Sequence, residues 1–199
     1  MKAVLLAAGK GDRLGDITLT KPKPMIKINN KPVLEHNLEM CKNAGINDIC
    51  INLHHLPDII KNYFGDGSKF GVNITYNFEH ELLGTAGALI PFQDNLHNTP
   101  FFVIYGDNHL CFDLMDLKLF NEKMKADISI LFHWCNNVRS SGIAEFDNKD
   151  RIKKFVEKPL DTNYNHDWVN AGVYYIQSNS IIDLIQPSDD FGYDFFPKL

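Results

Sequence analysis

Hydrophobic and polar positions follow one another in blocks that predict strands and helices in alternation. An apolar run over residues 2–8 ends at a glycine and predicts a first strand that is buried on both faces. Apolar positions at near-helical spacing over residues 31–44 predict a helix that stops at Gly45. Further strands are predicted over residues 48–53, 72–78 and 101–105, and short helices over 57–64 and 85–89. This alternation predicts an α/β protein with a mostly parallel, doubly wound sheet.

The later part of the chain is richer in strands that are joined by short turns. Strand-like segments cover residues 128–134, 142–147, 152–159 and 168–176. No repeat, low-complexity tract or linker separates the two parts of the sequence. We therefore expect one domain over residues 1–199, in which both parts share one core.

Composition and charge narrow the functional classes. The chain has 199 residues, of which 44% are hydrophobic, and this suits one globular unit. Its net charge of −5 argues against a nucleic-acid-binding surface, which needs a basic excess. The apolar start is too short for an export signal, and the sequence has no run of about 18 apolar residues that could span a membrane. We therefore expect a cytoplasmic protein with no membrane or nucleic-acid partner.

The four cysteines are scattered and form no C-x-x-C pair. This spacing favours neither a zinc site nor a disulfide framework. It predicts buried thiols in a reducing compartment, at positions Cys41, Cys50, Cys111 and Cys135.

The segment GKGDRLG, residues 9–15, looks like a phosphate-binding loop but fits neither common glycine fingerprint. The third glycine of a dinucleotide fingerprint falls one residue late, at Gly15, and no Gly-Lys-Ser/Thr follows for a P-loop. Residues 18–24 contain two Lys-Pro pairs, so they are predicted to be extended rather than helical. Arg13 and at least one of Lys21 and Lys23 are expected to form a cationic pocket for a polyphosphate with the loop N–H groups. The alternative is a glycine-rich turn followed by a solvated basic loop.

Five motifs together give the sequence a family resemblance. They are LAAGKGDRL with KPKPM (residues 6–14 and 21–25), LGTAG (83–87), YGD (105–107), EKP (157–159) and VNAG (169–172). In this order and near this spacing they resemble the sugar-1-phosphate nucleotidylyltransferases, and the nearest resemblance is to mannose-1-phosphate and heptose-1-phosphate guanylyltransferases. Asp12 stands where the family usually has threonine. The resemblance implies a Rossmann-like, doubly wound mixed sheet of the GT-A type.

The resemblance also implies a reaction and the residues that serve it. A nucleoside triphosphate and a sugar 1-phosphate would give a nucleotide sugar and pyrophosphate, with Mg²⁺ as cofactor. Arg13, Lys23, Asp107 and Lys158 would be catalytic, with Asp107 as the metal ligand. The nucleotide would contact Leu6, Ala7, Ala8, Gly9, Gly11, Arg13, Lys23, Glu79, Gly84 and Thr85. The sugar phosphate would contact Gly142, Glu157, Lys158 and Asn170.

The identity of the nucleobase depends on Glu79, which stands where uridylyl- and thymidylyltransferases of the family usually have glutamine. A carboxylate only accepts hydrogen bonds, so it suits the adjacent N1–H and N2–H₂ donors of guanine better than the carbonyls of uracil or thymine. This argument favours GTP. Residues 21–35 and 168–176 resemble those of the mannose-1-phosphate and heptose-1-phosphate guanylyltransferases, which implies a mannose- or heptose-type sugar. A member that uses UTP, dTTP or CTP is the alternative.

Family members usually continue past a segment like residues 195–199 and supply a second metal-binding aspartate there. The sequence ends at Leu199, which predicts either a shortened catalytic domain or a compact variant with one protein carboxylate on its metal. Asp190 and Asp194 precede the expected position and are not assigned to the metal. A non-catalytic nucleotide-sugar-binding relative and a hydride-transfer enzyme with a dinucleotide fold are the other hypotheses. The oligomeric state is left open, and a homo-oligomer is compatible with the aromatic segments 174–175 and 191–196.

Overall fold

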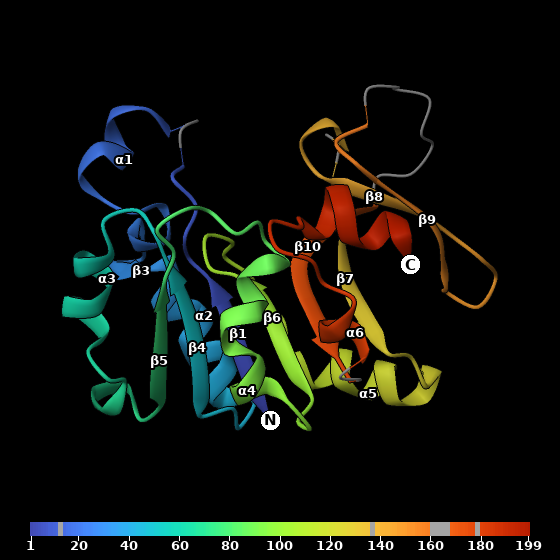
Figure 1. Ribbon diagram of the computed structural model, residues 1–199, viewed down its shortest axis with the longest axis horizontal. Coiled ribbons are helices and arrows are strands. Elements are labelled where there is room, and N and C mark those ends of the chain that lie inside the picture. The colour runs from blue at the N-terminus through green and yellow to red at the C-terminus, as the bar shows by residue number, and fades with distance from the viewer. Residues whose placement is uncertain (12–13, 136–137, 160–167, 178–179) are drawn as a thin grey trace.

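A computed structural model describes residues 1–11, 14–135, 138–159, 168–177 and 180–199, and shows a central sheet with helices on both faces (Figure 1). The sheet has eight strands in the order β5-β4-β1-β6-β10-β8-β9, and β7 pairs with β10 as well. The strands are β1 (Lys2–Leu6), β4 (Asp48–Leu53), β5 (Asn73–Phe78), β6 (Phe101–Tyr105), β7 (Ile128–Trp134), β8 (Gly142–Phe146), β9 (Ile152–Glu157) and β10 (Trp168–Ile176). A separate two-stranded sheet consists of β2 (Lys27–Ile28) and β3 (Lys31–Pro32).

Four neighbouring strands are parallel, and their order across the sheet is β5, β4, β1 and β6. Counted along the sequence, these are the third, second, first and fourth of the parallel strands. The chain therefore leaves β1 toward one side of the sheet first and later crosses to β6 on the other side of β1. Leu6 is in register with Asn52 on β4 and with Tyr105 on β6, so the carboxyl ends of these strands lie level. Ligands of such sheets bind where the strand order reverses, which is here the edge between β1 and β6.

The remaining strands pair in antiparallel fashion. β10 lies beside β6, with Val173 opposite Ile104, and it also pairs with β7 and β8. The register of β10 against β7 shifts between Asn170 and Tyr174. Because β10 runs opposite to β6, the amino end of β10 meets the carboxyl end of the parallel strands. The predicted α/β class with a doubly wound mixed sheet is confirmed.

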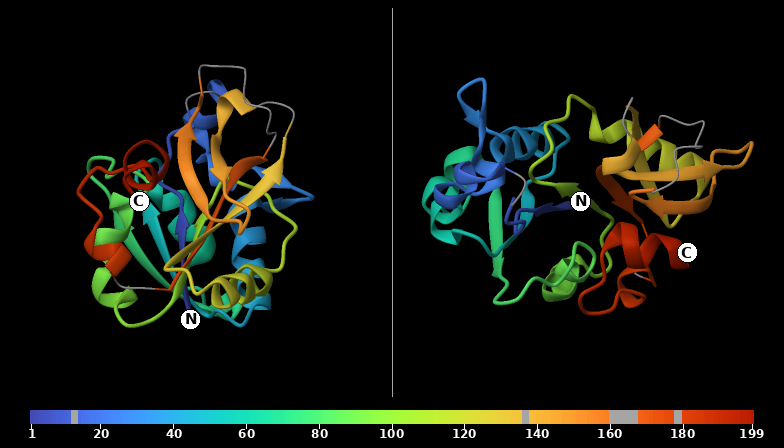
Figure 2. Two further views of the ribbon diagram at one scale, coloured as in Figure 1. Left: turned by 90° about the vertical axis from the view of Figure 1, so that its right-hand side faces the viewer. Right: turned by 90° about the horizontal axis from the view of Figure 1, so that it is seen from above.

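Two hydrophobic clusters cover the two faces of the sheet. Successive residues of β1 point to opposite faces and therefore belong to different clusters. Leu5 packs with the helices α2 (Val33–Asn43), α3 (Pro57–Phe64) and α5 (Leu114–Met124). Leu6 packs with the 3-10 helix η4 (Gly87–Phe92), with α4 (Gln93–Leu96), with α6 (Ser180–Asp183) and with the C-terminal turns. Figure 2 shows α2 on one side of the sheet and the green and red segments on the other. The aromatic segments 174–175 and 191–196 contribute buried core residues, with the exception of the exposed Tyr193.

Several predicted elements differ from the structure. The first strand ends at Leu6 instead of residue 8, and β9 ends at Glu157 instead of residue 159. The helix over 31–44 begins only at Val33, because Lys31 and Pro32 form strand β3. Residues 85–89 do not form an α-helix, and the 3-10 helix η4 starts at Gly87 instead. The expectation of an extended segment over 18–24 is wrong at both ends, since α1 (Asp16–Thr20) is a short helix and η2 (Lys23–Met25) is a 3-10 turn. The pre-proline rule determines only the middle, where Lys21 is extended and ends α1.

The prediction of buried thiols is confirmed for Cys41 and Cys50 and is wrong for Cys111, which is exposed. Burial raises the pKa of the Cys41 thiol to about 12 and that of Cys50 to about 11. Both therefore stay protonated at neutral pH, which makes them poor nucleophiles and metal ligands. In the part of the chain that the structure describes, no helix has the length and apolar character needed to cross a membrane. The cytoplasmic location stays a prediction.

Candidate active site at the carboxyl edge of the sheet

The glycine loop leaves β1 at the edge where the strand order reverses. The Ala7 N–H donates to Asn52 Oδ1 at 2.7 Å, which fixes the start of the loop against β4. Gly11 has φ 73°, and a Cβ there would lie 2.9 Å from Thr18 Cγ2 and 3.1 Å from Lys23 Cβ. Only glycine combines this backbone conformation with so close an approach, so the loop folds back onto the Lys23 side chain. The predicted residue Arg13 and its neighbour Asp12 lie outside the described residues.

Lys23 and Asp107 form an ion pair at this edge. The Lys23 Nζ donates to Asp107 Oδ2 at 2.5 Å, and both side chains are partly buried. Asp107 follows Tyr105, the last residue of β6, and Lys23 belongs to the turn after α1. Lys21, in contrast, is exposed. Of the two lysines between which the sequence could not choose, Lys23 is thus the one that reaches the end of β6.

Glu79 is buried just after β5 and accepts two hydrogen bonds within the protein. Its Oε1 accepts from Asn52 Nδ2 at 2.7 Å, and its Oε2 accepts from the Leu83 N–H at 3.0 Å. Because Asn52 also accepts from Ala7, the carboxylate links the glycine loop with the loop that begins at Leu83. Sequence reasoning gave Glu79 a role toward the base and missed this internal one. Asn52 was missed as well, although a polar residue near the end of a buried strand was a usable signal.

Gly84 and Thr85 are held by the C-terminal segment. A Cβ on Gly84 would lie 2.3 Å from the carbonyl oxygen of Asp189. Thr85 Oγ1 donates to Asp190 Oδ2 at 2.8 Å and accepts from the Phe191 N–H at 2.8 Å. The shape of this nucleotide-side loop therefore depends on residues about a hundred positions later. Asp190 has a structural role here that the sequence did not predict.

The residues predicted for the sugar phosphate lie together on the antiparallel strands. Gly142 on β8 is directly opposite Glu157 on β9, and Lys158 follows with its Nζ 3.7 Å from Glu157 Oε1. Burial, and after it the nearby Asp190 carboxylate, raise the pKa of Glu157, while Lys158 opposes this shift. Asn170 on β10 donates to Tyr174 Oη at 2.8 Å and accepts from the Gly172 N–H at 2.9 Å.

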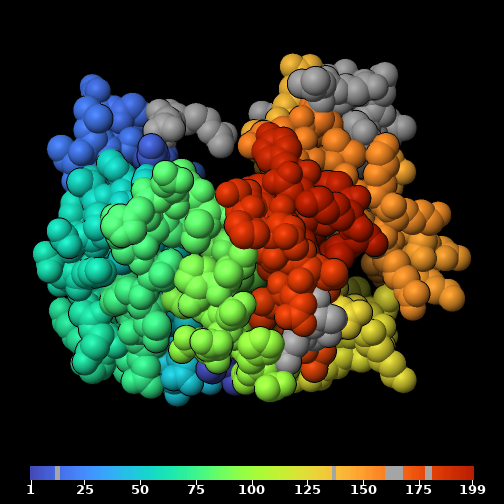
Figure 3. Space-filling view, in the orientation of Figure 1, coloured from blue at the N-terminus to red at the C-terminus, as the bar shows by residue number. Residues whose placement is uncertain are grey.

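One hydrogen bond connects the neighbours of residues that are predicted to serve the nucleotide and the sugar phosphate. Asn108, next to Asp107, donates from Nδ2 to the carbonyl of Ala171, next to Asn170, at 2.9 Å. Asp107 and Asn170, which directly precede the two bonded residues in the sequence, are therefore held near each other. Figure 3 shows the molecule hollowed at this upper edge, between the blue N-terminal segment and the orange and red C-terminal half.

Several groups of the site could hold a cation or an anion. Asp107 already accepts one cation, the Lys23 ammonium, which shows that its carboxylate is accessible to positive charge. Among the described residues, no three His, Cys, Asp or Glu side chains come together as a metal site. A Mg²⁺ ion held by Asp107 would need substrate phosphates and water as its other ligands.

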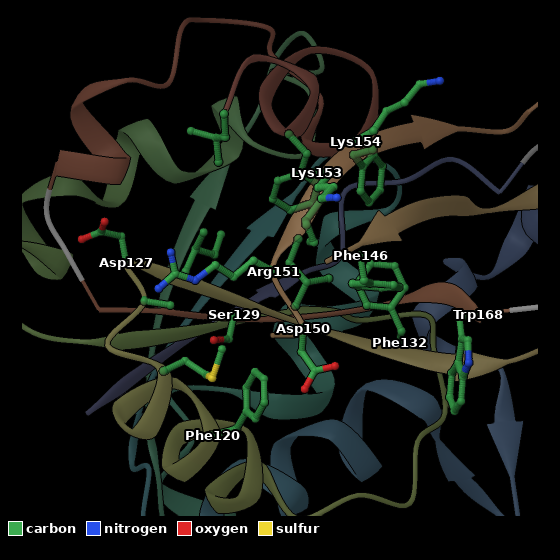
Figure 4. Close-up of a pocket in the computed structure, with 18 of the residues that line it drawn as sticks. Phe120, Asp127, Ser129, Phe132, Phe146, Asp150, Arg151, Lys153, Lys154 and Trp168 are labelled. Atoms are coloured by element: carbon green, nitrogen blue, oxygen red, sulfur yellow. The ribbon is translucent and has the colours of Figure 1, made fainter. Parts of the chain in front are cut away.

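A cavity of about 980 Å³ lies elsewhere, beside β7 and β9 (Figure 4). Its lining includes Phe132, Phe146 and Trp168, with Arg151 and Lys153 among the charged residues. None of the predicted site residues that the structure describes lines it. The predicted charged residues at the strand ends, rather than this cavity of mixed lining, therefore define the candidate site.

Comparisons with known proteins show which proteins the chain is similar to. Over its full length, the chain is 36% identical to the UTP–glucose-1-phosphate uridylyltransferase of Synechocystis, and it covers 55% of that protein. With 93% of its length, it is 36% identical to the mannose-1-phosphate guanyltransferase of Yarrowia lipolytica and covers 51% of it. The chain thus spans about half the length of these curated relatives.

A solved structure supports the fold independently. The crystal structure of a protein from Bacillus anthracis, reported as a putative glucose-1-phosphate thymidylyltransferase, superposes with a TM-score of 0.84 at 27% identity. The match covers 94% of this chain and 76% of that one. The sequence also matches the nucleotidyl transferase family over residues 2–199. The family resemblance of the motifs is confirmed, and the chain belongs to the nucleotidyl transferase family.

Proposed function

We propose that the protein transfers a nucleotidyl group from a nucleoside triphosphate to a sugar 1-phosphate and releases pyrophosphate. The observation that carries the proposal is the meeting of two sets of residues at one edge of the sheet. Lys23 and Asp107 form an ion pair just past the end of β6. Glu157 and Asn170 lie on β9 and β10, and Lys158 follows β9. The Asn108 to Ala171 hydrogen bond fixes the two sets against each other.

The reaction needs charge neutralisation and alignment more than proton transfer. A phosphate oxygen of the sugar 1-phosphate attacks the α-phosphorus, a new P–O bond forms, and the bond to the β-phosphate breaks with its electrons leaving on pyrophosphate. The attacking oxygen is already anionic, so no general base is required. We assign the triphosphate to the loop N–H groups and Lys23, and the sugar phosphate to Lys158. Arg13 is proposed from the sequence to stabilise the leaving pyrophosphate.

Mg²⁺ is the proposed cofactor, and Asp107 is the residue that would hold it. A bound Mg²⁺ supplies positive charge at the phosphate oxygens. Lys23 orients the Asp107 carboxylate and adds a second positive charge to the same place. Asp107 and Lys23 thus bring a carboxylate and an ammonium group together at the proposed position of the phosphates.

We propose GTP as the nucleotide and a mannose- or heptose-type sugar 1-phosphate as the acceptor. The guanyltransferase from Yarrowia lipolytica supports this choice, whereas the equally similar uridylyltransferase from Synechocystis supports UTP. Glu79 is only 3% exposed, and its two oxygens already accept from Asn52 and Leu83. Guanine would therefore have to reach the remaining lone pairs of these oxygens.

A panel of triphosphates and sugar phosphates tests the proposal. We expect pyrophosphate release with GTP and with mannose 1-phosphate or a heptose 1-phosphate, and slower release with UTP, dTTP or CTP and with glucose 1-phosphate. Release can be followed by a coupled colorimetric assay. Turnover with UTP or dTTP but not with GTP would rule out the proposed base, and no turnover with any pair would favour a nucleotide-sugar-binding protein.

Glu79→Gln separates base selection from the internal role of the carboxylate. Glutamine offers one acceptor where Asn52 and Leu83 each donate, so we expect a lower melting temperature. If Glu79 also accepts from guanine, the ratio of kcat/KM for GTP to that for UTP falls by about tenfold. Both kcat/KM values and the melting temperature should be measured on the same preparation. An equal loss with both triphosphates would show that Glu79 only supports the loops.

A further inference from the structure

The Glu157 carboxylate lies between two glycines that come from distant parts of the chain. A Cβ on Gly142 would lie 2.6 Å from Glu157 Oε2, and a Cβ on Gly192 would lie 2.4 Å from the same oxygen. Gly142 belongs to β8, whereas Gly192 belongs to the C-terminal turn η6 (Phe191–Phe195). Figure 1 shows this red turn beside the orange strands β8 and β9. The carboxylate therefore occupies space that any other residue at position 192 would fill.

The next residue of the same turn contacts Lys158. The Lys158 Nζ lies 5.0 Å from the centre of the Tyr193 ring, within the range of a cation–π interaction. Lys158 has φ 46°, an uncommon conformation for a lysine, which directs the chain sharply after β9. Consecutive residues of one turn thus contact the consecutive residues Glu157 and Lys158.

The turn itself is anchored to the nucleotide side of the site. Asp190 Oδ1 accepts from the N–H groups of Gly192 at 2.8 Å and Tyr193 at 3.2 Å, which sets the start of the turn. The other oxygen of Asp190 accepts from Thr85 in the LGTAG loop. Asp194 Oδ2 accepts in turn from the Asp190 N–H at 2.9 Å. The position of the turn is therefore fixed by contacts that do not involve Glu157 or Lys158.

We propose that Gly192 and Tyr193 are positioning residues for the sugar-phosphate side of the site. Gly192 leaves the space in which the Glu157 carboxylate sits, and the Tyr193 ring holds the Lys158 ammonium. The inference rests on the proposed function, because it assigns Glu157 and Lys158 to the sugar phosphate. It adds that the binding geometry of this substrate is set by the C-terminal turn rather than by the strands alone.

Gly192→Ala tests the first half of the proposal. The new methyl group meets the end of a flexible side chain, and Gly192 does not have a positive φ, so the variant is expected to fold. The displaced carboxylate should raise the KM for the sugar 1-phosphate by about tenfold, while the KM for the triphosphate stays unchanged. In a Glu157→Gln background the same substitution should have a smaller effect, because the two changes act on one contact.

Tyr193→Leu tests the second half, and Tyr193→Phe is its matched control. Leucine removes the aromatic face and should raise the KM for the sugar 1-phosphate by about two- to fivefold, whereas phenylalanine should keep it. The KM for the triphosphate and the melting temperature should stay at the wild-type values in both variants. A purely structural role of the turn would instead change the melting temperature and both KM values together, and that result would overturn the proposal.

Lys158→Met distinguishes a failure of this inference from a failure of the proposed function. If the wild-type protein turns over no sugar 1-phosphate, or if Lys158→Met leaves the KM for that substrate unchanged, the functional assignment is wrong. If Lys158→Met raises this KM while Gly192→Ala and Tyr193→Leu do not, the assignment stands. In that case the positioning role of the turn is refuted.

Discussion

Asp107→Asn is expected to reduce kcat by about two orders of magnitude or more, because the asparagine amide is a much weaker ligand for Mg²⁺ than a carboxylate. The fold should persist, since the Lys23 to Asp107 ion pair is partly exposed and such pairs contribute about 0 to 1 kcal/mol. Pyrophosphate release at several Mg²⁺ concentrations, with a melting curve of the same sample, measures both effects.

Asp94→Asn is the matched control for this variant. Asp94 is exposed on α4, and its substitution removes the same charge away from the site. The kcat of Asp94→Asn should equal that of the wild type, and a metal chelator should abolish the activity of these two proteins. Near-normal kcat of Asp107→Asn at ordinary Mg²⁺ concentrations would contradict the assignment of Asp107 as the metal ligand.

Lys23→Met is expected to reduce kcat by about 100- to 1,000-fold, because it removes a positive charge from the place where the phosphates meet. Methionine keeps a long apolar side chain, so the packing of Gly11 against the Lys23 side chain is largely retained. An alanine at this position would lose that packing and mix a folding effect with the loss of charge. Single-turnover rates of pyrophosphate release separate the chemical step from product release.

Lys21→Met provides the comparison within the same segment. Lys21 is exposed and extended, two residues before the lysine that contacts Asp107. The variant should turn over at the wild-type rate, with at most a small rise in the KM for the triphosphate. Equal losses in the two methionine variants would mean that both lysines reach the phosphates, against the arrangement in the structure.

The elements that the sequence predicted best are short segments whose ends are marked by glycine, proline or polar residues. Residues 48–53, 57–64 and 101–105 form β4, α3 and β6 with the predicted bounds. Helix α5 was missed because its apolar positions are not confined to one face, and Leu119 and Phe120 on it are exposed. Asp113 was an available signal for this helix, since its side chain caps the first turn by accepting from the Met115 N–H.

The residues of the candidate site were predicted from motifs, but the contacts that hold these residues together were not. Motif order suggested that Lys23 and Asp107 belong together, and the structure places them in contact. No local pattern indicates that β10 pairs with β6 in antiparallel fashion, because strand pairing is decided by contacts between distant residues. For the same reason, the contacts of Asn52 with Glu79 and of Gly192 with Glu157 could not be derived from spacing.

The position of β10 also limits how this fold can evolve. Tyr174 and Tyr175 are buried on opposite faces of the sheet, and Asn170 lies a few residues before them at the site. An insertion of one residue inside β10 would exchange these faces and bury the wrong side chains. Substitutions at the strand ends and changes in the lengths of the loops between β8, β9 and β10 leave this register intact. Variation among related proteins is therefore expected there rather than inside the strand.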